Sequence, residues 1–203
     1  MKTLLALDLA GSEQRATGWA ALHSGRVLYG IAYKNSELLM LAKAMEPAAI
    51  IIDAPLTLPA GRKSIDKRDG NHFRECDLQL RAEGIKFFPI TLGPMRMLTK
   101  RGMKLKKQLA LHAAVFEGFP GASYDRLRLP RKNQKKIEAF LRRLGFPAAT
   151  GASQDEFDAL ILLLTLMLKQ KGLDRTFSGK DGEILAPLPL TALGNKIKTV
   201  KLQ

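Results

Sequence analysis

Three aspartates that stand far apart in the chain have the surroundings of metal-binding carboxylates. Asp8 ends a short apolar run, Asp53 ends a run rich in isoleucine, and Asp158 comes directly before a ten-residue run that is apolar at nine positions. Carboxylate oxygens of this kind suit Mg²⁺ or Mn²⁺, which are held by a few carboxylates and keep open positions for water and phosphate oxygens. We therefore take Asp8, Asp53 and Asp158 as candidate metal ligands that would support hydrolysis by an activated water.

Two further acids join this candidate catalytic set. Asp155 stands three residues before Asp158, which places both on one face of the expected helix, although the helix dipole also explains an acid in the first turn. Glu117 follows a short apolar run and is a candidate fourth acid, or it pairs with the surrounding basic residues. For the other acids the alternatives are a turn-forming role at Asp8 and Asp53 and a salt bridge at Asp158.

Short apolar runs and turn residues predict the strands that position these acids. The expected strands are residues 3–8, 17–22, 27–33, 49–52 and 113–116. The fourth run is continuously apolar and β-branched, as expected for a parallel strand that is buried on both faces.

The remaining periodicity predicts helices. They are expected over residues 36–46, 73–82, 95–111, 133–144 and 153–171. The last of these has the clearest start, because Ser153 and Glu156 stand at capping-box spacing before the apolar run.

This order of elements predicts an α/β domain of the ribonuclease H-like fold. We expect a mixed five-stranded sheet, three strands antiparallel and two parallel, flanked by helices. The basic segment 56–112 would be a helical insertion after the fourth strand, within one domain over residues 1–190 that precedes a flexible basic tail over 191–203. In such a sheet the first and fourth strands are parallel neighbours, so Asp8 and Asp53 would meet at its carboxyl edge.

Composition excludes several other classes of protein. At 203 residues, 46% apolar and 26% charged, the chain is in the ordinary globular range. The single Cys76 cannot form an internal disulfide, and no histidine has cysteine partners at zinc-ligand spacing. No signal peptide is evident, and the apolar run 159–168 has roughly half the ~20 residues that cross a bilayer. We therefore expect a cytoplasmic protein without a membrane partner.

The strong positive charge points to a polyanionic partner. The formal net charge is +14, from 33 Lys and Arg against 19 Asp and Glu. Two clusters of basic residues could follow a phosphate backbone. The first stands at helical spacing and consists of Arg96, Lys100, Lys104 and Lys107, and the second consists of Arg131, Lys132 and Lys135. The alternative for each cluster is a solvated helix face. Because no base-reading element is evident, we expect binding through backbone and shape.

The chain also resembles a known family, on segments that together span most of its length. These are LDLAGSEQRATGWA, IIDAPLTLP, RECDLQLRAEGIKFFPITLGPMRMLTKRG, VFEGFPGAS and GASQDEFDALILLLT. They resemble the domain-of-unknown-function family 429, which is described as predicted nucleases of the ribonuclease H fold. The resemblance implies this fold and an acidic site with Asp8, Asp53 and Asp158 at matching positions, and Glu117 in an E-x-x-P-G motif. It implies no particular substrate.

These observations lead to a metal-dependent nuclease as the main hypothesis. Two Mg²⁺ or Mn²⁺ ions about 3.5 to 4 Å apart can stabilise both the attacking and the leaving oxygen of phosphodiester hydrolysis. A second hypothesis is a nucleic-acid-binding module whose acids have no catalytic role. A third is a nucleotide-binding phosphotransferase of the actin-like superfamily, because residues 8–12 faintly resemble its first phosphate loop. The sequence does not decide between DNA and RNA, or the oligomeric state.

Overall fold

The computed structural model of the chain describes residues 2–67 and 70–202. Its strands are β1 (Leu4–Asp8), β2 (Thr17–His23), β3 (Arg26–Ala32), β4 (Ala49–Asp53), β5 (Ala114–Gly118), β6 (Asp174–Gly179) and β7 (Gly182–Pro187). Its helices are α1 (Asn35–Met45), α2 (Glu75–Ala82), α3 (Gly93–Leu109), α4 (Pro120–Arg126), α5 (Gln134–Arg143), α6 (Gln154–Gln170), α7 (Leu190–Leu193) and the 3₁₀ helix η1 (Gly194–Val200).

The strands form one sheet in the order β3-β2-β1-β4-β5-β7-β6. β2 is antiparallel to both β1 and β3, whereas β4 is parallel to both β1 and β5. The first five strands therefore have the order and directions expected for a ribonuclease H-like fold, and this part of the prediction is confirmed.

The prediction of five strands is wrong, because the described chain has seven. β6 and β7 form an antiparallel hairpin, and β7 joins β5 in parallel at Gly118 and Leu185. The sequence signal was weak because β6 reads DRTFSG, with a single buried apolar side chain, Phe177. A charged strand at the edge of a sheet lacks the apolar alternation on which a strand prediction depends.

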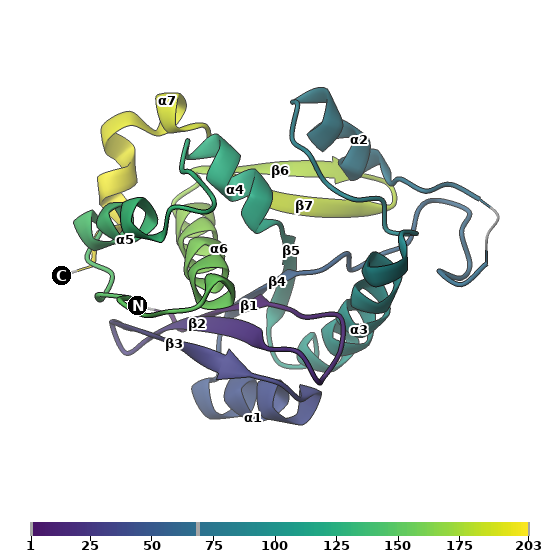
Figure 1. Ribbon diagram of the computed structural model, residues 1–203, viewed down its shortest axis with the longest axis horizontal. Helices are drawn as coiled ribbons and strands as arrows, with labels where there is room; N and C mark the ends of the chain where they lie inside the picture. Colours follow the sequence, from purple (N-terminus) through teal and green to yellow (C-terminus); the bar gives the residue numbers. More distant parts are fainter. Residues whose placement is uncertain (1, 68–69, 203) are drawn as a thin grey trace.

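The sheet is buried on both faces by helices. Along β1, Leu4 and Ala6 belong to one apolar core and Leu5 and Leu7 to the other, as the period of two requires. The first core lies under α4, α5 and α6, and the second under α1 and α3. Figure 1 shows these two groups of helices on opposite sides of strands β1–β4.

Helix α6 begins where the capping pattern predicted and crosses the sheet as its most buried helix. The Ser153 hydroxyl accepts from the Glu156 amide at 3.2 Å, and the Glu156 carboxylate accepts from the Ser153 amide at 2.8 Å. A Cβ added to Gly18 of β2 would stand 1.9 Å from the Asp155 carbonyl oxygen. Glycine at this position therefore lets the first turn of α6 rest directly on the sheet beside Asp8, the partner of Gly18 across the strands.

The last residues differ from the expected flexible tail. α7 and η1 cover one end of α6, and Leu193, Ile197 and Val200 are buried against it. The Leu202 amide also donates to the Leu144 carbonyl at 2.9 Å. The three apolar residues follow at intervals of four and three, which is one face of a helix, but the lysines between them hide this pattern.

None of the described helices is long and apolar enough to cross a bilayer.

Candidate active site

Asp8 and Asp53 meet at the carboxyl edge of the sheet. Leu7 pairs with Ile52 in the parallel register of β1 and β4, so the next residue of each strand stands beside the other. Their carboxyl groups are in hydrogen-bonding contact. Burial raises the pKa of Asp8 well above its ordinary value, and the charges of Asp53 and Asp158 raise it further. Burial also raises the pKa of Asp53 to about 7, although the hydrogen bond with Asp8 opposes this. The pair therefore retains a proton near neutral pH unless a cation replaces it.

Asp158 approaches the pair from α6, and two donors fix its orientation. The Tyr124 hydroxyl and the Gln154 amide each donate to its Oδ1 atom at 2.7 Å. Burial raises the pKa of Asp158, whereas these two hydrogen bonds lower it. Because both of these hydrogen bonds end on Oδ1, Oδ2 is the oxygen that remains for a ligand. The charge of Asp158 also raises the pKa of both Asp8 and Asp53.

Asp155 adds a fourth negative charge to this edge. It lies in the first turn of α6, and its charge raises the pKa of both Asp8 and Asp158. Its backbone rests on Gly18, so its position is determined by the contact between the helix and the sheet.

Glu117 lies nearby, but a buried arginine holds its carboxylate. Arg74 donates to both oxygens of Glu117, at 2.7 and 2.6 Å, and the Leu56 amide donates to Oε2 at 2.8 Å. Arg74 also pairs with Asp77 at 2.8 Å. Burial raises the pKa of Glu117, and Arg74 opposes this. The network therefore connects the start of α2 to β5, and the ionic partner of Glu117 is a guanidinium.

Two residues that position the site were not anticipated from the sequence. Tyr124 lies on α4, a short helix that the sequence analysis did not predict, and its side chain is 1% exposed. Arg101 lies on α3 and is also buried; it donates to the carbonyls of Ala10 and Ser12 at 2.8 Å and to that of Tyr33 at 2.6 Å. It thereby fixes the loop that follows Asp8. In the sequence, the only sign of either role is that the residue lies near an acidic or glycine-containing segment. An arginine in a basic helix, such as Arg101, is normally expected to be exposed.

The basic residues expected to bind a phosphate backbone lie in different surroundings. Arg96 and Lys100 both pair with Asp66, at 3.4 and 2.7 Å, while Lys104 and Lys107 are exposed further along α3. In the second cluster Lys132 and Lys135 are exposed.

Arg131 is the member of these clusters that reaches the acids. Its guanidinium donates to the Asp125 carboxylate at 2.6 Å and to the Gly121 carbonyl at 2.9 Å. Its charge lowers the pKa of Asp158. It also lines the cavity beside Asp53.

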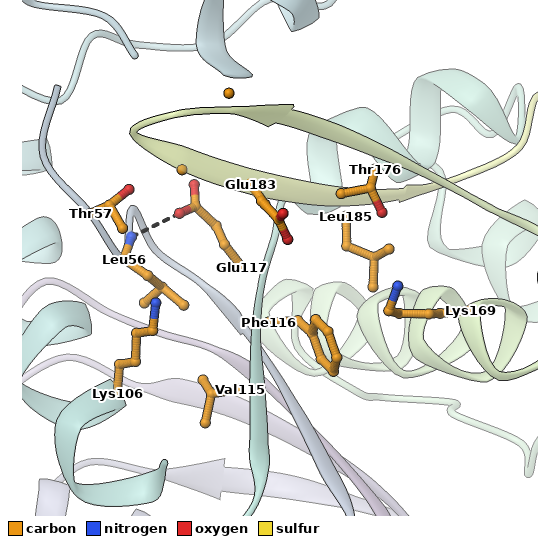
Figure 2. A pocket seen from close by; sticks show the side chains of 12 residues that line it. Leu56, Thr57, Lys106, Val115, Phe116, Glu117, Lys169, Thr176, Glu183 and Leu185 are labelled. Atoms are coloured by element: carbon orange, nitrogen blue, oxygen red, sulfur yellow. Dashed lines mark hydrogen bonds between the residues drawn. The ribbon is translucent and has the colours of Figure 1, made fainter. Parts of the chain in front are cut away.

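That cavity has a volume of about 460 Å³ and lies on the insertion side of the acids. Figure 2 shows a smaller one, of about 250 Å³, lined by β5, β7 and two lysines, Lys106 and Lys169. Glu117 lines both cavities, and its bond to the Leu56 amide stands at one side of the smaller one. Because Asp53 lines the larger cavity, that cavity is the one continuous with the candidate site.

The donor set fits a hard divalent cation with few protein ligands. Within residues 2–67 and 70–202, no three His, Cys, Asp or Glu side chains are placed to hold a metal together. The Asp8–Asp53 pair supplies two carboxylates, and Mg²⁺ is commonly bound by one or two carboxylates with water and substrate phosphates completing its shell. Burial raises the pKa of both acids and the negative charges around them add to this, and a cation bound between the carboxylates would act in the opposite direction.

Comparison with known proteins gives a distant structural likeness. No family model and no curated protein sequence matches the chain, so membership of family 429 stays a prediction. Among solved structures, Thermus thermophilus RuvC in complex with a Holliday junction substrate is similar, with 11% identity and a TM-score of 0.48 over 84% of this chain and 96% of that one. At this level the fold assignment rests on the order and directions of the strands.

Proposed function

We propose that this protein is a nuclease that hydrolyses phosphodiester bonds of nucleic acid with Mg²⁺ or Mn²⁺. The observation that carries the proposal is the contact between the buried carboxyls of Asp8 and Asp53 at the carboxyl edge of parallel strands. Two acids in this position cost stability when both are ionised, and a divalent cation would offset the cost. The formal charge of +14 supports a polyanionic substrate.

Each acid has a distinct part in this proposal. Asp8 and Asp53 would hold the cation, and Asp158, whose charge acts on both, would add negative charge at the same edge. When bound, the cation supplies positive charge that stabilises the charge developing on the phosphate oxygens. In the reaction the oxygen of water forms a bond to phosphorus, one ester P–O bond breaks, and a proton of the water ends on the leaving oxygen.

Other side chains would keep this arrangement in place. Tyr124 and Gln154 hold Asp158 in one orientation, and Arg101 fixes the loop after Asp8. Glu117 acts through Arg74 as a positioning residue, and Arg131 is the cation best placed to meet a phosphate near Asp158. Asp155 would add negative charge that strengthens the attraction for a cation.

The test is a cleavage assay with a panel of labelled DNA, RNA, hybrid and branched substrates in Mn²⁺ or Mg²⁺. We expect at least one substrate to be cut, and Asp53→Asn to abolish the cutting. Glu46→Gln is the matched control, because Glu46 is an exposed carboxylate at the end of α1. Intact substrates throughout the panel, or full activity of Asp53→Asn, would contradict the proposal.

A non-catalytic nucleic-acid-binding module is the second candidate. The observation that favours it is the absence, within the described ranges, of three potential ligands placed together for a metal. Calorimetric titration with Mn²⁺ separates the two functions. The nuclease requires saturable uptake that Asp8→Asn removes, whereas a binding module retains nucleic-acid affinity and shows no uptake that depends on Asp8.

A further inference from the structure

The cavity beside Asp53 has the size and lining of a binding site for a small flat group. Its volume of about 460 Å³ lies within the range of about 300–1,000 Å³ that is usual for ligand pockets. Phe87, Phe88 and Phe119 contribute aromatic surface to its lining, and Met95 and Leu98 of α3 contribute aliphatic surface. Such walls are suited to an aromatic ring that is held by stacking and van der Waals contact.

The insertion builds most of this lining. Residues 86–90 and the first turns of α3 bring apolar side chains to the end of β4, where Asp53 stands. The close approach of α3 has a local cause: a Cβ on Gly102 would stand 2.6 Å from the Cβ of Ala54. The small residues at both positions therefore let the helix reach the sheet directly after the acid.

The charges around the cavity match a nucleotide better than a purely apolar ligand. Arg74, Asp77 and Glu117 also line the cavity but pair with one another in their own network. Lys86 and Arg131 contribute further cations, and Asp53 would hold the metal ion that binds the phosphate in the proposed function. Phe88 is 67% exposed, although it lines the cavity. An exposed aromatic ring beside a pocket offers a face on which a flat ligand can stack.

We propose that this cavity takes one unstacked nucleobase of the strand whose phosphate is held at Asp8 and Asp53. The inference rests on the proposed nuclease function and names its substrate class, which is nucleic acid with an unpaired or extruded nucleotide next to the scissile bond. A base in a regular duplex is stacked on both sides and must leave the stack to enter a pocket. Phe88 provides the stacking surface at the mouth of the cavity, and Met95 provides a wall.

The test measures base binding separately from cleavage. Two DNA single strands of equal length are compared in a chelating buffer. One is wholly abasic, and the other is abasic except for a single 2-aminopurine. We expect the wild-type protein to bind the second strand at least about five-fold more tightly, with quenching of the 2-aminopurine fluorescence, since stacking of one base on an aromatic side chain is worth roughly that factor or more. Phe88→Ala and Met95→Ala should reduce this preference.

Met97→Ala is the matched control, since Met97 is a neighbouring α3 residue, 54% exposed and outside the lining of the cavity. It should leave the preference unchanged. Equal affinity for the two strands overturns the base site, and so does a preference that Phe88→Ala and Met95→Ala both retain. This holds even if a strand with all its bases is cut in Mn²⁺. A preference for the base, with every substrate of the cleavage panel left intact, supports the base site and overturns the nuclease. Failure to bind either strand overturns the base site, whereas the nuclease is decided by the cleavage panel.

Discussion

Replacing Asp53 by asparagine should stabilise the metal-free protein at alkaline pH, although it removes a residue of the proposed site. In the folded chain burial raises the pKa of Asp53 from 3.8 to about 7. Between these values the folded state holds a proton that the unfolded state has lost. Stability must therefore fall as the pH rises from about 4 to about 7, and it stays low above that range. Asp53→Asn removes this loss because asparagine does not ionise.

The size of the effect follows from the same shift. A tenfold change in a protonation equilibrium is worth about 1.4 kcal/mol, so the rise from 3.8 to about 7 corresponds to at most roughly 4 kcal/mol at about pH 8. At about pH 4 the wild-type carboxyl is protonated in the folded state and still partly protonated in the unfolded state, so this gain should shrink to below about 1 kcal/mol.

Urea unfolding with a chelator, at about pH 8 and about pH 4, measures this difference directly. Glu46→Gln is the control for the loss of an exposed carboxylate. Adding Mn²⁺ at the higher pH should raise the urea midpoint of the wild type and not that of Asp53→Asn, because a ligand that binds the folded state stabilises it. A free energy of unfolding for Asp53→Asn that follows the wild-type value at both pH values would refute the argument that the acid pair lacks a cation.

Three further substitutions test the elements that hold the site. Gly18→Ala should cost about 3 kcal/mol or more in urea unfolding, since its Cβ would meet the Asp155 carbonyl oxygen at 1.9 Å; a cost below about 1 kcal/mol would contradict this packing. Tyr124→Phe should cost about 1–2 kcal/mol and also weaken Mn²⁺ binding, because Asp158 loses a 2.7 Å hydrogen bond; unchanged calorimetric affinity would speak against orientation by Tyr124. Glu117→Gln should cost about 3 kcal/mol or more, measured by thermal and urea unfolding, because the buried Arg74 loses a charged partner, and a neutral result would contradict the network.

The parts of the site that the sequence predicted are those that depend on local patterns. Asp8 and Asp53 each end an apolar run, and the parallel pairing of those runs follows from the order of the elements. The start of α6 was predictable because Ser153 and Glu156 carry the capping chemistry within four residues. In each case the signal lies in neighbouring residues, so one sequence is enough to detect it.

The parts that the sequence did not predict depend on partners far apart in the chain. Arg74 meets Glu117 across 43 positions, and Arg101 meets Ala10 across 91. From the sequence such arginines are expected at the surface. A buried guanidinium is stable only when hydrogen-bond acceptors surround it, and here those acceptors are distant in the chain. The same limitation applies to Tyr124, whose partner Asp158 lies 34 positions away.

The two groups of buried charge at this edge differ in a way that separates structure from function. Arg74, Glu117 and Asp77 form a cluster in which the cation has anionic partners at 2.6–2.8 Å, as a structural network requires. The Asp8–Asp53 pair has no cation among the charges that act on it, because those charges, from Asp155, Asp158 and Glu117, are also negative. The fold pairs the buried Glu117 with Arg74, yet it leaves Asp8 and Asp53 facing each other. The stability lost when both of these aspartates ionise has no explanation in the needs of folding alone. A ligand of positive charge removes that cost, which is why we assign Asp8 and Asp53 to cation binding and Glu117 to support.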